Sequence, residues 1–475
     1  MFGGFLGLAL LKFGNPPIME KWVSYPAGFF EFLVGTPWPT NWAYWLLGLT
    51  AVVAVPVLRA KPRPPLWLTL LPAAWFVWQL IAGAFSADFD LSRPTLKHLA
   101  ACVACFYLGL FALSRVDRLW PFFAGLLCGF TMVIAIGLDQ HFGGLEESRR
   151  YFYHQLYLYP QAKDVPPEFL KKMASNRIYS TLFYPNTLAG ALLLFLPAML
   201  VAGPSLRARL QSVSSSRVPT LATILGFTLA CLYLYLLSSK VGWVVIVVLG
   251  LVALFPFPQW SFPGLLAAGT LACLYWSGSK GGWLLMMLLG LIALLRVPFA
   301  KQLKILLLAV VLACGLAGFF WKYAAFFRKG ATSVVARFDY WRAAVQTVAA
   351  NPVVGTGPGT FSIPYQRIKR PESEMARLAH NDYLEQASDS GVLGLIIYTV
   401  FVAGGLTWTF RRAVCPPAAY APADPLEARL RFALWLGVLG WSLQGLVEFP
   451  LYIPALAWPA FAFLGLLLGK AAASR

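Results

Sequence analysis

His380 is the side chain in this sequence best suited to proton transfer. It opens the segment His380-Asn381-Asp382-Tyr383-Leu384-Glu385, which lies between a group of arginines and an apolar run starting at Gly391. Histidine exchanges protons near neutral pH, as a general base must. A single loop histidine often has no such role. The neighbouring carboxylates and arginines nevertheless favour His380 as a base, with Asn381, Asp382 and Glu385 in supporting positions where the carboxylates orient the histidine or pair with arginines.

The stretch 322–390 is rich in cations, which suits the binding of a phosphate-containing anion. A solvated surface near anionic lipid headgroups would show the same excess, so each single residue has two interpretations. The cations are Lys322, Arg328, Lys329, Arg337, Arg342, Arg367, Lys369, Arg370 and Arg377.

Two similar stretches carry one lysine each at the same level. Ala230-Cys231-Leu232-Tyr233 leads to Lys240, and Ala272-Cys273-Leu274-Tyr275 leads to Lys280, with a tryptophan three residues after each lysine. Each stretch is predicted to form a helical hairpin with its lysine at the outward tip. Lysines near span ends commonly extend to the membrane interface, whereas the paired placement favours a common anionic site for Lys240 and Lys280.

The elements that must position these residues begin with a helix after Arg337. Arg337, Tyr340, Trp341, Ala344 and Val348 fall at helical spacing, which predicts a short amphipathic helix. Asn351-Pro352 is expected to end it. The following glycines, at 355, 357 and 359, predict a tight turn that brings backbone amides near a ligand.

The composition is that of a membrane protein. Hydrophobic residues make up 59% of the 475 residues and charged residues only 12%, about half of what a soluble chain uses. Apolar runs approach the roughly 20 residues that cross a bilayer as a helix, and they do not alternate as barrel strands would. We therefore predict an all-α, polytopic membrane bundle of about 12–14 transmembrane helices, with a partly helical periplasmic loop.

The predicted topology follows from the cations in the short connections, which favour the cytoplasmic side. One set of loops holds Arg59, Arg115, Arg207, Arg296, Arg411 and Lys470 with their basic neighbours, so both termini are expected inside. The spans are predicted near 2–13, 42–58, 66–84, 97–114, 120–139, 182–203, 219–238, 241–257, 262–277, 281–297, 303–321, 391–411, 431–448 and 453–470.

This topology divides the chain into five regions. They are N-terminal transmembrane helices (1–139), a first long periplasmic loop (140–181), central transmembrane helices with the repeated hairpins (182–321), a large periplasmic catalytic loop (322–390) and C-terminal transmembrane helices (391–475).

Metal and redox chemistry are not indicated. Six of the seven cysteines lie inside apolar runs, including the Cys102–Cys105 pair, where cysteine acts as a small packing residue. Neither a pair of carboxylates nor a His/Asp cluster stands out as a metal site. We expect no metal and no cofactor.

Three segments resemble those of the O-antigen ligase and O-antigen polymerase superfamily. The first runs from Arg337 through the glycine turn to His380-Asn381-Asp382-Tyr383-Leu384, the second from Arg177 to Ala189, and the third is Glu448-Phe449-Pro450-Leu451-Tyr452-Ile453-Pro454. The resemblance implies a polytopic enzyme that uses an undecaprenyl-diphosphate-linked glycan as donor. It implies transfer to an acceptor hydroxyl on the periplasmic face of the bacterial inner membrane.

The resemblance also implies roles for particular residues. Arg177 and Arg337 match arginines that bind the diphosphate, His380 matches the proposed base, and Asn186 lies in the second segment as a supporting residue. Where the family usually has Ser-Arg-Gly, this chain has Lys240 and Lys280, which keep the charge but lose the bidentate fork. The expected reaction is metal-independent, inverting glycosyl transfer.

The acceptor is left open by the sequence. An O-antigen ligase with lipid A-core as acceptor is the closest interpretation, and a polymerase or a protein O-oligosaccharyltransferase differs from it only in the acceptor. Outside the family, a polysaccharide or lipid transporter or a non-catalytic scaffold would explain the spans. Charged residues lie near span ends rather than mid-membrane, which disfavours a transporter. Membrane lipids are expected partners and nucleic acid is not.

Overall fold

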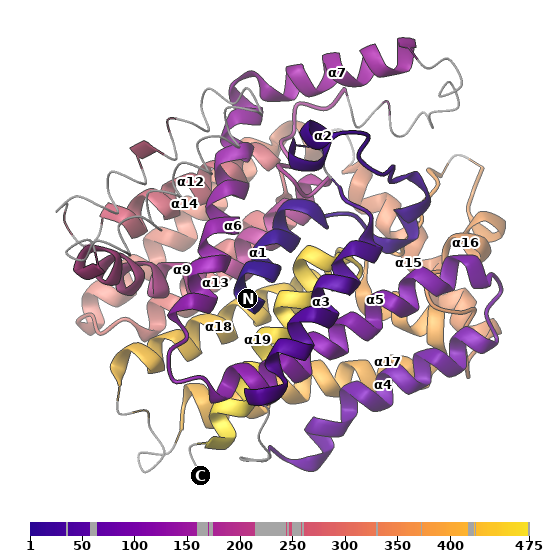
Figure 1. Cartoon of the computed structure of the whole chain (residues 1–475). Coiled ribbons are helices and arrows are strands. Elements are labelled where there is room, and N and C mark those ends of the chain that lie inside the picture. Colours follow the sequence, from indigo (N-terminus) through magenta and orange to yellow (C-terminus); the bar gives the residue numbers. More distant parts are fainter. Residues whose placement is uncertain are drawn as a thin grey trace.

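The computed structural model describes residues 1–34, 37–57, 64–158, 170, 174–213, 244, 247–248, 258, 261–328, 331–371, 373–416, 422 and 424–473. Among these residues every regular element is a helix (Figure 1). Lys240 and the predicted span 219–238 lie outside the described residues, as does most of the predicted span 241–257.

Seven helices of the described chain are long and apolar enough to cross a membrane. They are α4 (Leu66–Ala84), α5 (Phe89–Tyr107), α6 (Trp120–Asp139), α9 (Pro185–Val213), α14 (Lys301–Arg328), α17 (Asp382–Thr409) and α19 (Pro454–Ala473). Five further predicted spans within the described residues coincide with α1 (Phe2–Lys12), α3 (Thr40–Ala54), α12 (Ser261–Ser277), α13 (Lys280–Arg296) and α18 (Pro425–Gln444). The protein is therefore a polytopic helical membrane bundle, as predicted.

Further elements connect or extend these helices. They are η1 (Pro17–Trp22), α2 (Phe29–Val34), η2 (Val55–Val57), η3 (Leu108–Ala112), η4 (Leu113–Arg115), η5 (Gln140–Gly144), α7 (Leu145–Leu158), α15 (Thr332–Ala350), α16 (Ser362–Ile368), η7 (Phe410–Val414) and η9 (Pro450–Tyr452).

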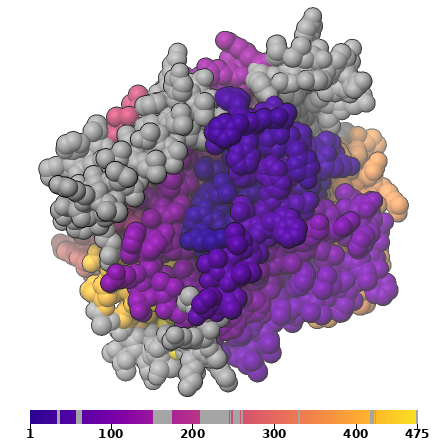
Figure 2. All heavy atoms as spheres, in the orientation of Figure 1, coloured from indigo at the N-terminus to yellow at the C-terminus, as the bar shows by residue number. Residues whose placement is uncertain are grey.

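Helix α19 is the centre of the bundle. Of its most apolar 18 residues, 94% are buried inside the protein, against 6% for α14. It packs against α5, α18, α1, α17 and α9, and the N-terminal helices cover it on the face seen in Figure 2. Because lipid is as apolar as these side chains, close backbone approach rather than a hydrophobic gradient must stabilise such packing. Gly109 and Gly465 allow it, since a Cβ on either would collide with the facing backbone.

The short helix α1 is joined to α6 in the same way. Its 11 residues reach only about 16 Å, about half of the hydrocarbon core. Gly3 and Gly7 of α1 face Gly125 and Gly129 of α6, and a Cβ at any of the four would strike the opposite backbone. This paired four-residue spacing is the small-residue pattern of close membrane helix contacts.

The two ends of the bundle differ in their charged contacts. At one end, Arg296 donates to the Val414 carbonyl at 3.2 Å and lies over the Phe432 ring. Glu427 accepts there from Arg431 at 2.8 Å and lies 4.0 Å from Lys470. These arginines and Lys470 belong to the set predicted to be cytoplasmic. Helix α13 runs from this end to Lys280 at the other.

The segment between α14 and α17 has a small core of its own. Tyr340, Ala343 and Ala344 of α15 pack with Tyr365 of α16 and with Phe361, the residue before it. Helix α15 ends at Ala350, with Asn351 as its C-cap, so the helix predicted from the spacing after Arg337 and its predicted end are confirmed.

The glycine turn completes a broken helix. Helix α17 is interrupted at Ser390 and Gly391, whose φ is +72°, which leaves carbonyls of the preceding turn without helical partners. The amides of Thr356 and Gly357 donate to the Ser388 and Asp389 carbonyls at 3.0 and 2.9 Å, and Gly359 donates to the Asp389 carboxylate at 2.7 Å. The tight turn was predicted correctly, but these amides bind α17 rather than a ligand.

Gly391→Ala is expected to destabilise the protein. An L-residue is strained at this backbone conformation, and a Cβ would collide with the Val353 carbonyl, so we expect a loss of about 2 kcal/mol or more. Thermal unfolding in detergent measures it. Gly48→Ala in α3 is the control, because a Cβ there meets open space and alanine favours a helix; equal melting temperatures for the two variants would contradict the prediction.

Candidate active site

Glu448 is the centre of a polar cluster at the end of the bundle opposite Arg296. It lies in the connection between α18 and α19 and is largely buried. One carboxylate oxygen accepts from the Asn186 amide at 2.5 Å and from the Arg337 guanidinium. The other oxygen lies 3.0 Å from Nδ1 of His380. Residues far apart in the sequence are thus held by one carboxylate.

Two arginines extend this cluster. Arg337, on α15, also donates to the backbone carbonyls of Val447 and Ser333, both at 2.9 Å. Arg177, just before α9, donates to the Ser277 carbonyl at 2.7 Å and to the Asn186 side-chain oxygen at 2.8 Å. Asn186 therefore bridges Arg177 to Glu448.

Lys280 adds a third cation. It is the first residue of α13, and the Ser279 hydroxyl caps this helix by accepting from the Gly282 amide at 3.2 Å. Its ammonium lies 4.0 Å from the centroid of the Phe326 ring and 5.0 Å from that of Tyr323. Burial, together with the charges of Arg177 and Arg337, lowers the pKa of Lys280 to about 8. The ammonium is thus charged at neutral pH but close to losing its proton.

Charge compensation keeps Glu448 ionised. Burial alone would raise the pKa of Glu448, but the Arg337 guanidinium and the hydrogen bond with His380 hold it below its usual value. A buried carboxylate is tolerated when it is paired and hydrogen-bonded in this way. The cluster therefore combines an ionised acid with three cationic side chains.

The backbone of His380 is held in an unusual conformation. Its φ of +52° lies in the left-handed region, which non-glycine residues adopt at a cost of about 1–3 kcal/mol, often at functional sites. The preceding Ala379 amide donates to the Glu385 carboxylate, and the next side chain, Asn381, donates to the Leu446 carbonyl at 2.9 Å. These bonds on both sides fix where the imidazole points.

The imidazole ring has one nitrogen available for chemistry. The ring stacks on Tyr340, with 5.6 Å between centroids, and meets the edge of Phe449 at 4.8 Å. With Nδ1 on Glu448, Nε2 has no hydrogen-bond partner among the described residues, and the side chain is 30% exposed. A carboxylate on Nδ1 sets the tautomer in which Nε2 can accept a proton.

The supporting residues act on the backbone rather than on the imidazole. Asn381 caps α17 by accepting from the Tyr383 and Leu384 amides, both at 3.0 Å. Asp382 accepts from the Leu451 amide at 3.0 Å. Asp382 therefore joins the start of α17 to the loop of Glu448, while Glu385 holds the Ala379 amide next to His380. Among the described residues, neither carboxylate contacts the imidazole or an arginine directly.

Most of the predicted site residues come together. Arg177, Asn186, Lys280, Arg337 and His380 gather at this end of the bundle, while Lys240 lies outside the described residues. Glu448 was not among the predicted site residues, although it heads the third recurrent segment. Its position at a span end did not distinguish it, because its partners come from α9, α15 and the loop before α17.

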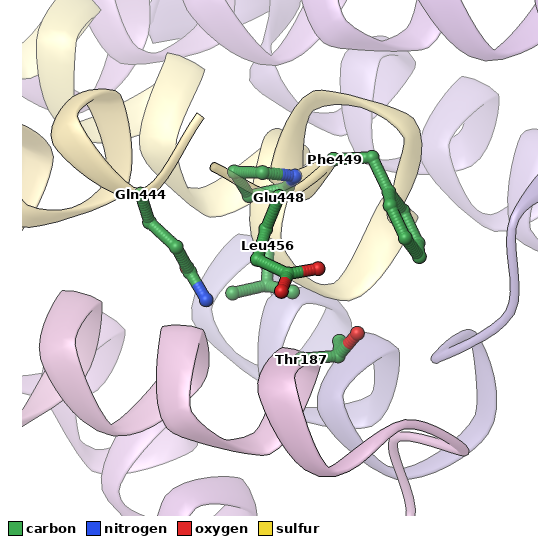
Figure 3. A pocket seen from close by; sticks show the side chains of 6 residues that line it. Thr187, Gln444, Glu448, Phe449 and Leu456 are labelled. Atoms are coloured by element: carbon green, nitrogen blue, oxygen red, sulfur yellow. The ribbon is translucent and has the colours of Figure 1, made fainter. Parts of the chain in front are cut away.

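A small pocket lies on the inner side of Glu448. It is lined by Thr187, Gln444, Glu448, Phe449, Pro450 and Leu456 (Figure 3), and its volume is about 10 Å³. That volume holds about one water molecule at most, so a glycan chain does not fit on this side of the carboxylate. Across the described ranges, no three His, Cys, Asp or Glu side chains form a group able to hold a metal ion.

Comparison with known families agrees with this geometry. Residues 265–399 match the family model described as O-antigen ligase. Over these residues the match supports the predicted resemblance to the O-antigen ligase superfamily. A search of curated proteins found no match. This superfamily consists of membrane glycosyltransferases and ligases. The matched segment contains Lys280, Arg337 and His380, whereas Arg177, Asn186 and Glu448 of the O-antigen ligase-like site come from outside it.

Lys280→Arg is expected to extend anion binding to higher pH. A lysine is charged below its pKa, so the Lys280 contribution is full well below about pH 8 and is lost above it. A charge-assisted hydrogen bond contributes about 1.5–3 kcal/mol, or roughly tenfold or more in affinity. We expect the affinity of the wild type for inorganic diphosphate to fall between pH 7 and pH 9 by more than the affinity of Lys280→Arg falls. Isothermal titration calorimetry measures both affinities. Parallel pH curves for the two proteins would contradict the assignment.

Proposed function

We propose that the protein transfers a glycan from undecaprenyl diphosphate to an acceptor hydroxyl on the periplasmic face, as an O-antigen ligase with lipid A-core as acceptor. The observation that carries the proposal is a free imidazole nitrogen beside three cations. His380 Nε2 is unoccupied among the described residues, and Arg177, Arg337 and Lys280 surround the same carboxylate-centred cluster. The match of residues 265–399 to the O-antigen ligase family supports a lipid-linked glycan as donor.

The proposed reaction needs a base and a stabilised leaving group. His380 Nε2 takes the proton from the acceptor hydroxyl, and the hydroxyl oxygen attacks the anomeric carbon of the donor glycan. The bond from that carbon to the diphosphate oxygen breaks, and undecaprenyl diphosphate leaves with the electron pair. Attack opposite the leaving group inverts the anomeric carbon. The proton on His380 then passes to solvent.

The cations stabilise the charge that builds on the diphosphate. Arg177 and Arg337 present planar guanidinium groups suited to phosphate oxygens, and Lys280 presents a point charge. Charge-assisted hydrogen bonds are stronger than neutral ones and act best when they are already in place in a water-poor site. Three fixed cations supply the leaving-group stabilisation for which other enzymes use a divalent metal.

The charge distribution supports a periplasmic site in the bacterial inner membrane. Arg296, Arg431 and Lys470 lie at one end of the bundle, and cations in short connections favour the cytoplasmic side. The His380 cluster lies at the opposite end. A lipid-linked donor lying in the membrane would reach it from the side.

His380→Ala tests the base directly. General base catalysis contributes roughly 10²–10⁴-fold, so we expect a loss of transfer rate of that size with little change in donor affinity. Membranes carrying the variant are assayed with a lipid-diphosphate glycan. His141→Ala is the control, because His141 stacks on Trp276, outside the cluster around Glu448. Full activity of His380→Ala would refute the base assignment.

The acceptor is identified by the product that purified protein forms. With a lipid-diphosphate glycan and lipid A-core present together, we expect glycan attached to lipid A-core, and EDTA should leave the rate unchanged. Longer lipid-linked chains would indicate a polymerase, and a glycosylated protein would indicate an oligosaccharyltransferase. Lack of every product would overturn the enzyme proposal in favour of transport or scaffolding.

A further inference from the structure

Glu448 stands where an anionic donor would have to bind. Its carboxylate accepts from the Arg337 guanidinium directly, and it is linked to Arg177 by way of the Asn186 side chain. These arginines are the groups proposed above to hold the donor diphosphate, so a carboxylate of the protein and the phosphates of the substrate compete for the same donors. A site designed only to bind an anion would not contain a buried carboxylate at its centre.

The fixed orientation of Arg337 makes this competition direct. Arginine has five N–H donors in one plane. Nε donates to the Val447 carbonyl and Nη1 to the Ser333 carbonyl, while Nη2 faces Glu448. The backbone bonds hold the plane of the guanidinium, so a phosphate that reaches Nη2 has to share it with Glu448 or displace the carboxylate.

The other oxygen of Glu448 faces the base. His380 Nδ1 lies 3.0 Å from it, and among the described residues the imidazole also contacts the rings of Tyr340 and Phe449. The charged groups acting on Glu448 are Arg337, Arg177, His380 and, from the first turn of α17, Asp382. Of these, Arg337 and Arg177 are the ones that a diphosphate would engage.

We propose that Glu448 is a positioning residue that couples donor binding to the base. The donor diphosphate displaces the Glu448 carboxylate from Arg337, and the negative charge of the carboxylate then acts mainly on His380. This inference rests on the proposed function. A carboxylate freed from a guanidinium stabilises the imidazolium that forms when the base takes a proton. His380 is then the stronger base when the donor is bound. When the donor is absent, the Glu448 carboxylate occupies Arg337.

Bonds that do not involve the side chain of Glu448 also hold the loop around this residue. The loop that carries it is held by the Leu451 amide on Asp382 at 3.0 Å, the Leu451 carbonyl on His98 at 2.7 Å and the Leu446 carbonyl on Asn381 at 2.9 Å. An isosteric change at position 448 therefore removes the charge and leaves the loop in place.

Glu448→Gln is the test, made on the full-length protein in detergent with inorganic diphosphate as probe. Binding should become tighter, on the order of tenfold, the size of a typical coupling between two ligands, because the competing carboxylate is gone. The turnover number of glycan transfer should fall, and the acid limb of its pH profile should move to lower pH. A residue that only held the site together would weaken diphosphate binding and transfer alike.

Two further variants sharpen the result. Asp339→Asn removes a carboxylate from the same helix as Arg337, but one that pairs with Arg342 at 3.8 Å, so diphosphate binding should stay within about twofold of the wild type. Glu448→Asp draws the carboxylate back from Arg337 and should bind diphosphate with intermediate strength. It carries the test if the glutamine variant does not fold.

The outcomes separate this inference from the proposed function. Unchanged or weaker diphosphate binding in Glu448→Gln, or in Glu448→Asp if only that variant folds, overturns the coupling while wild-type transfer stands. An equal gain from Asp339→Asn also overturns it, because the effect would then be general electrostatics. If the wild type transfers no glycan from any lipid diphosphate, the proposed function fails instead, and the binding measurements alone decide whether Glu448 competes with diphosphate.

Discussion

The site depends on one buried carboxylate that is surrounded by cations. Removing a carboxylate from water costs several kcal/mol unless hydrogen bonds and opposite charges replace its hydration. Glu448 meets this requirement with Arg337, Asn186 and His380. Each partner comes from a different part of the chain, so satisfying one carboxylate also brings α9, α15 and the loop before α17 to the α18–α19 connection.

Contacts elsewhere in the bundle hold the residues around Glu448 in place. Helix α17 is broken at Gly391, and irregular backbone at membrane depth is tolerated only where the protein satisfies it. The glycine turn after α15 does so with its amides, and Trp78 of α4 donates to the Ser390 carbonyl at 2.8 Å. The first turn of α17, with its cap residue Asn381, is thereby fixed against the core, and His380 is fixed with it.

Local features of the sequence were sufficient to predict the helices and part of the site. Apolar runs locate the spans because lipid imposes their length, and the spacing after Arg337 locates α15 because helical periodicity is local. The role of the glycine turn was not predictable in this way, since its amides bind Ser388 and Asp389 some thirty residues further along the chain. Glu448 escaped prediction for the same reason: a single acid near a span end carries no local sign of its three partners.

The segment that matches the family model contains only part of the cluster around Glu448. Residues 265–399 contain Lys280, Arg337 and His380, so two cations and the base belong to the segment shared with the superfamily. Arg177 precedes α9, Asn186 lies in its first turn, and Glu448 follows α18. The segment by itself therefore has an imidazole without the carboxylate on Nδ1 and a guanidinium without its counter-charge. Its chemistry is completed only by packing against α9 and α18, and the geometry of that packing determines how strongly the base and the cations are coupled.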